Sequence, residues 1–403
     1  MKICVYEDKA ADLYPLTMTR PSYFLRLGTC TLIEKIIDLF PKDDIRLHCR
    51  PFLQESTAED YPGLAVNQPL DERTFFINGR AYVDRAFVDQ IDRGQVALYK
   101  NDREIVAAVL DEERVRSLDL QNAATLDFSQ FDLPVKKIEA RSFRYLWELI
   151  HANADAIVAE FESQQMGGQI HGRVHDGVFI TDRSRVYIAP GAEILPGVVL
   201  HSQTGPIYID RDVHILPHTA IEGPCYIGPG SIIKMGAKIY GGCSIGPVCK
   251  VGGEVENLIM QGYSNKQHEG YLGHAYIGEW CNFGADTNNS DLKNNYRNVK
   301  VQVNGRLVDT GQLFVGLFMG DHCKTGINTM FNTGTVVEVG CNIYGAGFPP
   351  RYIHAFVWGG PELEVKYDLE KTLATARAAM QRRGKSLTPA KHQVLQHLYE
   401  NSG

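Results

Sequence analysis

Aliphatic residues recur at every sixth position through the middle of this chain. A helix repeats about every 3.6 residues and a strand about every two, so neither explains this spacing. A flat-sided coil does, because each six-residue unit then forms one short strand and one corner, and three units complete a turn. The spacing therefore predicts stacked coils around a continuous aliphatic column. The unbroken part of the series is formed by Ile209, Ile215, Ile221, Ile227, Ile233, Ile239, Ile245 and Val251.

The series starts at Ile188 and is interrupted twice, over 254–273 and over 286–311. We interpret both interruptions as loops that leave an otherwise regular prism. Loops on a rigid scaffold often carry functional residues, so these two segments are the first places to search for a site. The series returns briefly at Ile277 and Phe283 and then in a last run, which is formed by Leu313, Met319, Thr325, Phe331, Val337 and Ile343.

The regions on either side of the coils have different patterns. Residues 1–140 read as an α/β domain, with a strand over 2–7, a helix over 31–40 and a buried strand over 74–78. Residues 141–177 read as a helix followed by a polar linker. The coiled domain is expected over 178–360. Residues 361–403 form a tail with two predicted short helices.

Composition narrows the class of protein. The chain has 403 residues and a net charge of −7, which argues against nucleic-acid binding. It has no apolar run of the about 18 residues that span a bilayer, and its first residues read as a strand rather than a signal peptide. We therefore expect a cytoplasmic protein with neither nucleic acid nor membrane as a partner. Nine cysteines without a CxxC pair argue against a disulfide framework or a zinc ribbon.

Two segments at the first interruption resemble a known family. Residues 264–273 read Ser-Asn-Lys-Gln-His-Glu-Gly-Tyr-Leu-Gly, and residues 277–285 read Ile-Gly-Glu-Trp-Cys-Asn-Phe-Gly-Ala. With the period of six, they resemble the hexapeptide-repeat acyltransferases, above all the acetyltransferase half of the bifunctional UDP-N-acetylglucosamine pyrophosphorylase/glucosamine-1-phosphate N-acetyltransferase family. The resemblance implies a left-handed parallel β-helix, acetyl-CoA as donor, an amino-sugar phosphate as acceptor, and a homotrimer with active sites between neighbouring prisms.

The resemblance also implies roles for single residues. His268 would be the general base, because an imidazole titrates near neutral pH and can take the proton of an amine. Tyr271 and Asn282 would contact the amino sugar, Ala285 would lie near the thioester, and Arg297 would replace a family lysine that meets the sugar phosphate. The alternative for His268 is a solvated loop histidine. Where the family has Asn-Tyr-Asp this chain has Ser-Asp-Leu, which leaves the acceptor open. Further candidates are Glu256, His274 and Asp291.

The N-terminal domain resembles the sugar-1-phosphate nucleotidyltransferases, in the alternative form found in some bacterial bifunctional enzymes. The resemblance rests on segments 15–35 and 78–80, which read Pro-Leu-Thr-x-Thr-Arg-Pro-x-x-x-Leu-Arg-x-Gly-x-x-Thr-Leu-x-Glu-Lys and Asn-Gly-Arg. It implies a nucleoside triphosphate and a sugar phosphate as substrates. The loop after the first strand lacks the family's glycines, so side-chain cations would have to hold the phosphates. The candidates for that role are Arg20, Arg26 and Lys35.

A second departure concerns Mg²⁺. Asn78 and Arg80 stand where the family places the aspartate that holds this ion, and arginine cannot ligate a metal. Both residues remain candidates for substrate binding, Mg²⁺ remains a candidate cofactor of this domain, and its ligands are unknown. Three interpretations follow: an enzyme with two active domains, an acyltransferase whose first domain only binds a sugar nucleotide, or a non-enzymatic scaffold or regulatory subunit.

Overall fold

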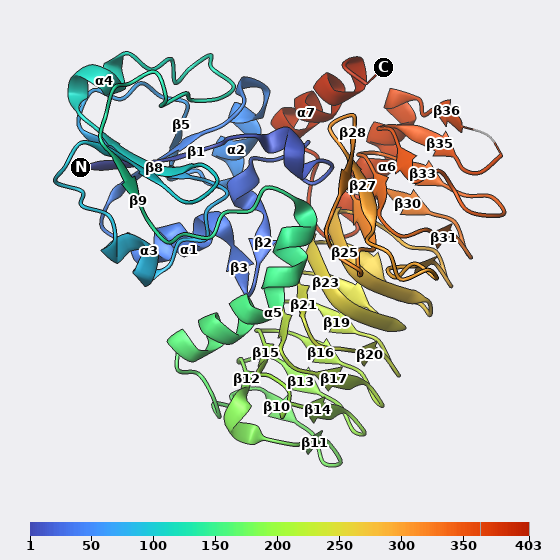
Figure 1. The fold of residues 1–403 in the computed structure, drawn as a ribbon. Coiled ribbons are helices and arrows are strands. Elements are labelled where there is room, and N and C mark those ends of the chain that lie inside the picture. The colour runs from blue at the N-terminus through green and yellow to red at the C-terminus, as the bar shows by residue number, and fades with distance from the viewer. Residues whose placement is uncertain (363, 403) are drawn as a thin grey trace.

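A seven-stranded sheet forms the core of the N-terminal domain in the computed structural model, which describes residues 1–362 and 364–402 (Figure 1). Its strand order is β5-β4-β1-β6-β8-β7-β9. The first four strands of this order run parallel, whereas β8 is antiparallel to both β6 and β7. The strands are β1 (Lys2–Tyr6), β4 (Asp44–His48), β5 (Ala65–Val66), β6 (Thr74–Asn78), β7 (Ala97–Lys100), β8 (Ile105–Leu110) and β9 (Val135–Lys137).

The order in which strands are added to the sheet reverses at β1. The chain first adds β4 and β5 on one side of β1 and then crosses to add β6 on the other side. Tyr6 pairs with Asn78, so β1 and β6 end at the same level. In open α/β sheets, ligands bind in the crevice beyond the carboxyl ends of two such strands. The topology therefore places a candidate site directly after Tyr6 and Asn78.

Helix α1 (Leu32–Leu39) confirms the helix predicted over 31–40. Thr31 caps it, because its hydroxyl accepts from the backbone N–H of Glu34 while the Glu34 carboxylate accepts from the N–H of Thr31. The predicted strands over 2–7 and 74–78 are also confirmed as β1 and β6. The remaining helices of the domain are α2 (Gln54–Asp60), α3 (Arg85–Asp89) and α4 (Glu112–Arg116).

Helix α5 (Leu146–Ser163) lies between the two domains (Figure 1). It contacts β2 (Arg26–Leu27) of the first domain and strands of the β-helix. Leu149 and Ile150 are fully or almost fully buried in a cluster that also contains Leu27 and Tyr276, one from each domain. Burial of this shared apolar surface holds the domains together.

The second domain is a parallel β-helix, and its aliphatic column is the one that the sequence predicts. Ile209 pairs with Ile227, which pairs with Ile245, and all three are fully buried. The regular coils contain β12 (Val186–Ile188), β13 (Glu193–Ile194), β14 (Val199–His201), β15 (Ile207–Ile209), β16 (His214–Ile215), β17 (Ala220–Glu222), β18 (Cys225–Ile227), β19 (Ile232–Ile233), β20 (Lys238–Ile239), β21 (Cys243–Ile245) and β22 (Lys250–Val251).

The coils begin within the segment expected to be a linker. Strand β10 (Arg173–Val174) already pairs with β13, and β11 (Phe179–Ile180) pairs with β14. Cys225 pairs with Cys243, and eight of the nine cysteines are buried. No helix in residues 1–362 and 364–402 is long and apolar enough to cross a membrane.

The prediction of a loop over 254–273 is wrong. This segment contains the whole of the long strand β23 (Glu254–Gly262), then β24 (Asn265–Lys266), and the start of a second long strand, β25 (Tyr271–Glu279). Lys238 pairs with Glu254, sixteen residues later, and Ser244 pairs with Ile259, fifteen residues later. The regular distance is eighteen, as between Ile227 and Ile245. The coil has thus lost corner residues, and two of its sides merge into one strand.

The second interruption is an insertion that leaves the prism, as predicted for most of 286–311. It carries an antiparallel hairpin of β27 (Lys300–Val303) and β28 (Arg306–Asp309). Leu313 is 43% exposed and does not belong to the last column, because the coil resumes only at β29 (Leu317–Met319). The last coils contain β26 (Asn288–Asn289), β30 (Lys324–Thr325), β31 (Met330–Phe331), β32 (Thr335–Val337), β33 (Asn342–Ile343), β34 (Tyr352–Ile353) and β35 (Val357–Gly359).

The tail contains the two predicted helices. They are α6 (Leu369–Gln381) and α7 (Pro389–Glu400), and the Thr388 hydroxyl caps α7 by accepting from the N–H of Lys391. Helix α7 packs on α2 of the first domain, while buried Leu373 of α6 belongs to a cluster that includes Phe356 of the last coil. The tail therefore bridges the two domains on the side of the β-helix that carries the last coils (Figure 1).

Candidate active sites

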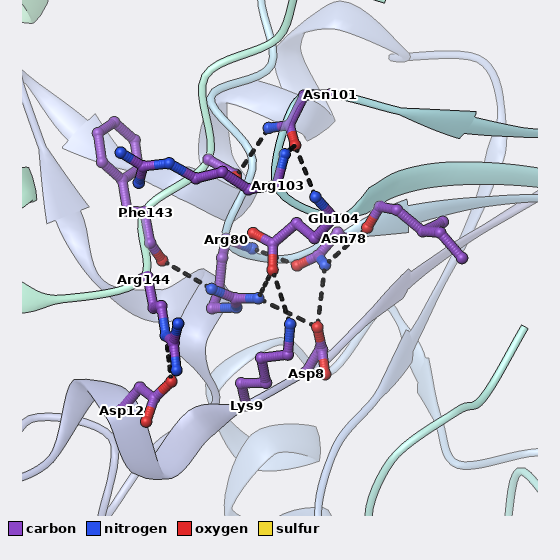
Figure 2. Close-up of polar contacts among 12 residues, drawn as sticks. Asp8, Lys9, Asp12, Asn78, Arg80, Asn101, Arg103, Glu104, Phe143 and Arg144 are labelled. Carbon is purple, nitrogen blue, oxygen red and sulfur yellow. Dashed lines mark hydrogen bonds and ion pairs between the residues drawn. The ribbon is translucent and has the colours of Figure 1, made fainter. Parts of the chain in front are cut away.

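The crevice beyond β1 and β6 contains a network of opposite charges (Figure 2). The fully buried guanidinium of Arg80 donates to Asp8 Oδ2 at 3.0 Å, forms an ion pair with Glu104, and donates to the carbonyl of Phe143 at 3.1 Å. Lys9 Nζ lies 3.2 Å from the same Glu104 oxygen. The network therefore balances two carboxylates against two cations.

Asn78 ends β6 as predicted and fixes this network to the backbone. Its amide nitrogen donates to the carbonyl of Ile105 at 3.2 Å and to Asp8 Oδ2 at 3.4 Å, while its oxygen accepts from the N–H of Arg80 at 3.0 Å. The sequence analysis did not single out Asp8, Lys9 or Glu104. The rule that sites follow the carboxyl ends of parallel strands would have found the first two.

This donor set does not fit a resident Mg²⁺. Burial favours the protonated form of Glu104, but the charge and hydrogen bond of Arg80, with further hydrogen bonds from neighbours, outweigh it and lower the pKa of this carboxyl. Mg²⁺ is usually held by one or two carboxylates together with substrate phosphates, but both carboxylates of this network already pair with Arg80, and Glu104 also pairs with Lys9. Within residues 1–362 and 364–402, no group of three or more His, Cys, Asp or Glu side chains is arranged to hold a metal.

The loop after β1 is fixed by a buried ion pair instead of glycines. Glu7 is 1% exposed and accepts from Arg50 Nε at 2.9 Å and Arg50 Nη2 at 3.1 Å, as well as from the backbone N–H of Ser22. Beside this loop lies a cleft of about 270 Å³ that is lined by Asp8, Lys9, Lys100, Arg103, Glu104 and Asp127. The cleft has three cations that can meet an anionic substrate.

Arg20 lies away from this cleft. It is buried at the contact with the β-helix, where it pairs with Asp321 and lies 3.5 Å from Glu279. Thr19 donates to the same Asp321 oxygen at 2.7 Å. The Thr-Arg-Pro motif thus faces the second domain.

Arg26 and Lys35 are also buried and paired with protein groups. Arg26 Nη1 donates to the carbonyl of Thr29 at 2.9 Å, and Lys35 Nζ donates to Leu27 O at 2.7 Å and pairs with Glu160 of α5 at 2.5 Å. The structure brings Asn78 and Arg80 together, but Arg26 and Lys35 lie apart from them. Their role in phosphate binding stays a prediction.

Four polar side chains gather at one corner of the β-helix. The Tyr271 hydroxyl lies 2.8 Å from Asp291 Oδ2 and 3.2 Å from Glu256 Oε2. His274 Nδ1 lies 2.8 Å from the same Asp291 oxygen. Burial would raise the pKa of Asp291, but the hydrogen bonds from His274 and Tyr271 lower it. The structure therefore joins Tyr271 to all three further candidates.

Aromatic rings cover this cluster. The His274 ring stacks on Phe314 of the insertion, with centroids 5.1 Å apart, and lies 5.8 Å from the ring of His151 on α5. Burial and the neighbouring His274 lower the pKa of His151. A Cβ at Gly273 would meet the Tyr271 hydroxyl at 2.1 Å, so only glycine fits beside this tyrosine. No local motif points to His151 or Phe314, because both come from distant segments.

His268 lies next to this cluster in the chain and is exposed. Within the described residues its side chain has no hydrogen-bond partner, but its carbonyl accepts from Lys266 Nζ at 2.5 Å. Lys266 is 1% exposed and continues the aliphatic column, where it pairs with Val251. Burial lowers the pKa of Lys266 to about 8. A lysine thus takes an aliphatic position of the column next to His268. Lys266 was not among the predicted site residues.

Asn282 and Ala285 lie on the coil that follows Lys266. Asn282 Oδ1 accepts from Asn265 Nδ2 at 3.3 Å, and the Ala285 carbonyl accepts from the N–H of Asn328 at 2.8 Å. They occupy the next turn of the β-helix, in register with β24.

Arg297 is exposed on the insertion among other cations. It lines a cavity of about 600 Å³ together with Lys293 and Lys300. Lys293 also lines a neighbouring cavity with Arg351. Burial and the nearby Arg351 and Lys300 lower the pKa of Lys293, which shows that these cations repel one another. An anion would relieve that repulsion.

The crevice, the strand order and the β-helix define a sugar nucleotidyltransferase-like domain joined to a hexapeptide-type coil. Residues 3–168 match the family model described as sugar nucleotidyl transferase.

Two relatives of the chain are named as bifunctional proteins. It is similar to the bifunctional sugar-1-phosphate nucleotidylyltransferase/acetyltransferase of Sulfurisphaera tokodaii, with 36% identity over 199 residues that cover 49% of this chain and 43% of that protein. It is also 25% identical over 310 residues to bifunctional protein GlmU of Methanocaldococcus jannaschii, covering 73% of this chain and 63% of that protein. The second match includes parts of both domains, because neither domain makes up 73% of the chain. The chain spans about half to just under two thirds of the length of these relatives.

Solved acyltransferases show only a weak overall similarity. AntD, an N-acyltransferase from Bacillus cereus, is 10% identical with a TM-score of 0.17, over 52% of this chain and 88% of AntD. UDP-N-acetylglucosamine acyltransferase from Campylobacter jejuni is 12% identical with a TM-score of 0.18, over 57% of this chain and 97% of that enzyme. Scores this low carry no argument about function.

Proposed function

We propose that the β-helix domain transfers an acetyl group from acetyl-CoA to the amine of an amino-sugar phosphate of the glucosamine 1-phosphate type. The observation that carries this proposal is the cluster of Tyr271, Asp291 and His274 beside His268. A purely structural corner has no need of a tyrosine, a carboxylate and an imidazole on one hydrogen-bonded path. The Sulfurisphaera tokodaii relative, which is named as a nucleotidylyltransferase and an acetyltransferase, supports the same activity.

The proposed chemistry uses His268 as the general base. Its exposed imidazole takes a proton from the amine, the amine nitrogen attacks the thioester carbonyl, and the thiolate of CoA leaves and is protonated. Lys266 holds the backbone of His268 from beneath. Tyr271, fixed by Asp291, orients the acceptor together with Asn282, and Ala285 lies near the thioester.

Charges around the cluster fit the two ends of such an acceptor. Glu256 and Asp291 lie where they attract an ammonium group before it is deprotonated. The cations of the insertion suit a phosphate, since Arg and Lys are the usual phosphate-binding side chains. In this proposal the phosphate is met by Lys293, Arg297, Lys300 and Arg351.

We further propose that the N-terminal crevice binds a nucleoside triphosphate and a sugar 1-phosphate and transfers the nucleotidyl group between them. Lys9, Lys100 and Arg103 in the cleft supply charge for the phosphates, while Arg80 occupies the place of the family's metal-binding aspartate. The match of residues 3–168 supports the nucleotidyl activity. The alternative interpretation, a domain that only binds a sugar nucleotide, is favoured by the fixed loop after β1 and by the unsuitable donor set for Mg²⁺.

The proposed assembly is a cytoplasmic homotrimer, because acetyl-CoA and nucleoside triphosphates are cytoplasmic substrates and the resemblance implies trimers. Apolar side chains that are exposed on the last coils support an interface there; they are Ile327, Met330, Tyr344 and Phe348. Light scattering after size-exclusion chromatography tests the state, and a monomer at micromolar concentration would contradict it.

The acetyl transfer is tested by release of free thiol from acetyl-CoA in the presence of glucosamine 1-phosphate. We expect turnover by the wild type and a loss of about 10²–10⁴-fold in kcat for His268→Ala. Absence of thiol release from the folded wild type would contradict the proposal. His218→Ala, which changes an exposed histidine on an earlier coil, is the matched control and should retain activity.

The nucleotidyl activity needs a separate assay. Pyrophosphate release from UTP with N-acetylglucosamine 1-phosphate is measured with and without Mg²⁺, and the binding of UDP-N-acetylglucosamine is measured by calorimetry. Pyrophosphate release supports an active domain. Binding of the sugar nucleotide without pyrophosphate release would show that the domain only binds, and failure of both would favour the scaffold interpretation for this domain.

A further inference from the structure

A cavity of about 480 Å³ lies where the N-terminal domain, the β-helix and the tail meet. Phe24 and Tyr61 of the first domain line it, as do Tyr263 and Trp280 of the β-helix and Leu395 of α7. A volume of this size suits a small molecule. The cavity shares no lining residue with the crevice at Arg80 or the cluster at Tyr271. It therefore has no part in either proposed active site.

The β-helix presents three rings to this cavity from one corner. In successive coils this corner is occupied by Gly230, Val248, Tyr263, Trp280, His322 and Gly340, which all have positive φ between 53° and 73°. Backbone hydrogen bonds confirm the alignment. The N–H of His322 donates to the carbonyl of Glu279, just before Trp280, and the N–H of Gly340 donates to the carbonyl of Asp321, just before His322. Glycine adopts this conformation at no steric cost, whereas other residues are strained by roughly 1 kcal/mol or more.

The three rings form a ladder. Tyr263 stacks on Trp280 with centroids 4.5 Å apart and planes at 16°, and Trp280 and His322 lie at 6.4 Å and 13°. Three consecutive coils thus carry an aromatic residue with strained, positive φ, and their rings form one wall of the cavity. Phe24 and Tyr61, 5.0 Å apart, add two further rings from the first domain. Such a lining is typical of sites for planar rings.

Two polar atoms at this cavity lack partners. Arg20 is 7% exposed, and its Nη2 is paired with Asp321, but its Nη1 has no hydrogen-bond acceptor in the described residues. Nδ1 of His322 is likewise buried without a partner. A buried donor without an acceptor costs free energy. A ligand that carries a ring carbonyl and a ring nitrogen would satisfy both atoms.

The charged side chains that line the cavity disfavour a strongly anionic ligand. The cations of the lining are outnumbered by its carboxylates, and Arg20 is already neutralised by Asp321 and Glu279. A phosphate would meet these carboxylates, whereas Arg20 and Lys391 already pair with Asp321 and Asp60. The charged lining consists of Arg20, Lys385 and Lys391 against Glu59, Asp60, Glu279 and Asp321.

We propose that this junction cavity binds the heterocycle of an uncharged nucleoside. A nucleobase such as uracil offers a planar ring for the aromatic lining, a ring carbonyl that can accept from Arg20 Nη1, and a ring nitrogen that can pair with His322 Nδ1. Because the bound ligand contacts both domains and the tail, it stabilises their arrangement by mass action. The Thr-Arg-Pro motif, which does not reach the nucleotidyl crevice, thereby acquires a binding role.

The test is a titration of the full-length protein with uridine and with adenosine, followed by tryptophan fluorescence and by the melting temperature. We expect at least one nucleoside to change the fluorescence saturably and to raise the melting temperature. In Trp280→Gly we expect binding about tenfold weaker or worse, because the central ring of the wall is lost. This variant should fold, since glycine occupies the same corner at 230 and 340.

Two further variants distinguish an effect at the cavity from an effect elsewhere in the protein. Trp358→Phe removes a tryptophan outside the cavity and should keep the response, and Arg20→Lys keeps the charge beside Asp321 but removes the free Nη1, so it should weaken binding. No binding of either nucleoside to the wild type, or equal binding by Trp280→Gly, would overturn the proposal. Thiol and pyrophosphate release are measured on the same proteins, so failure here is distinguishable from failure of the proposed function.

Discussion

Asp291 accepts a hydrogen bond from His274 across 2.8 Å, and this contact joins strand β25 to the insertion. His274 belongs to β25, the long strand of the shortened coil, whereas Asp291 begins the insertion. Neither segment contains the cluster alone. The candidate acetyl-transfer site therefore exists only because parallel pairing stacks one irregular coil on the next.

This contact predicts the effect of Asp291→Asn. The variant keeps the shape of the side chain but removes the negative charge that orients His274 and the Tyr271 hydroxyl. Loss of a hydrogen bond to a charged group costs about 1.5–3 kcal/mol, so kcat/KM for acetyl transfer should fall about 10- to 100-fold. Steady-state thiol release measures it.

A pH profile distinguishes the two histidines. If His268 is the base, His268→Ala abolishes the acidic limb of the pH–rate profile, while His274→Asn lowers the rate but retains that limb. The opposite pattern would move the base to His274.

Gly273→Ala should damage the site without unfolding the protein. The added Cβ would lie 2.1 Å from the Tyr271 hydroxyl and 2.7 Å from Asp291 Oδ2, so the tyrosine ring has to move. We expect a loss of acetyl transfer of at least about tenfold with a destabilisation of about 1–3 kcal/mol. Gly63→Ala, whose Cβ would meet nothing within 4 Å, is the control for both measurements. Full activity in Gly273→Ala would show that the position of Tyr271 is unimportant.

Lys266→Met is expected to trade activity for stability. Burial lowers the pKa of Lys266 to about 8, from the ordinary 10.5, so the folded state is penalised below pH 8. The penalty disappears as the pH rises from 8 to 10.5, because the unfolded chain then loses its proton too. The variant should be more stable by about 1–2 kcal/mol at pH 7, after allowing for the lost hydrogen bonds.

Urea unfolding at pH 7 and pH 10 measures this difference. The stability of the wild type should approach that of the variant at the higher pH. Acetyl transfer should fall in Lys266→Met, because the carbonyl of His268 loses its donor. An equal difference in stability between wild type and variant at both pH values would show that burial does not lower the pKa of Lys266.

Arg80→Met should be the most destabilising of these substitutions. It leaves Asp8 and Glu104 facing each other in a buried place without their shared cation. Breaking a buried ion pair by removing one partner costs about 3–5 kcal/mol. Thermal unfolding measures the effect, and Arg116→Met, which breaks an exposed pair with Glu112, should change stability by less than about 1 kcal/mol. Similar effects of both variants would contradict the structural role of Arg80.

The sequence pattern predicted the regular coils of the β-helix correctly, but the prediction for the irregular coil over 254–273 was wrong. The period of six is a local property, so the column from Ile209 to Val251 could be read directly from it. A missing period was interpreted as a loop, but over 254–273 it results from two sides of a coil becoming one strand. Spacing alone cannot distinguish a deletion at a corner from an extruded loop.

The candidate sites were partly predictable for the same reason. Tyr271, His268, Asn282 and Ala285 lie in segments with a recognisable order of residues. The burial of Arg20 against Asp321 depends on how two domains pack across 301 residues of chain, which no local motif encodes. The same holds for Phe314 and His151, which reach His274 from the insertion and from α5.

The varying perimeter of the coils has a wider consequence. Parallel pairing fixes the few residues that stack on each neighbour, but it leaves the length of the connection between them free. The spacing of paired residues ranges from fifteen to twenty-one residues and reaches forty-two across the insertion. Gains and losses of chain length can therefore accumulate at single corners while the apolar interior stays in register. A fold of this kind can acquire a new reactive surface through changes that would shift every residue of an ordinary sheet.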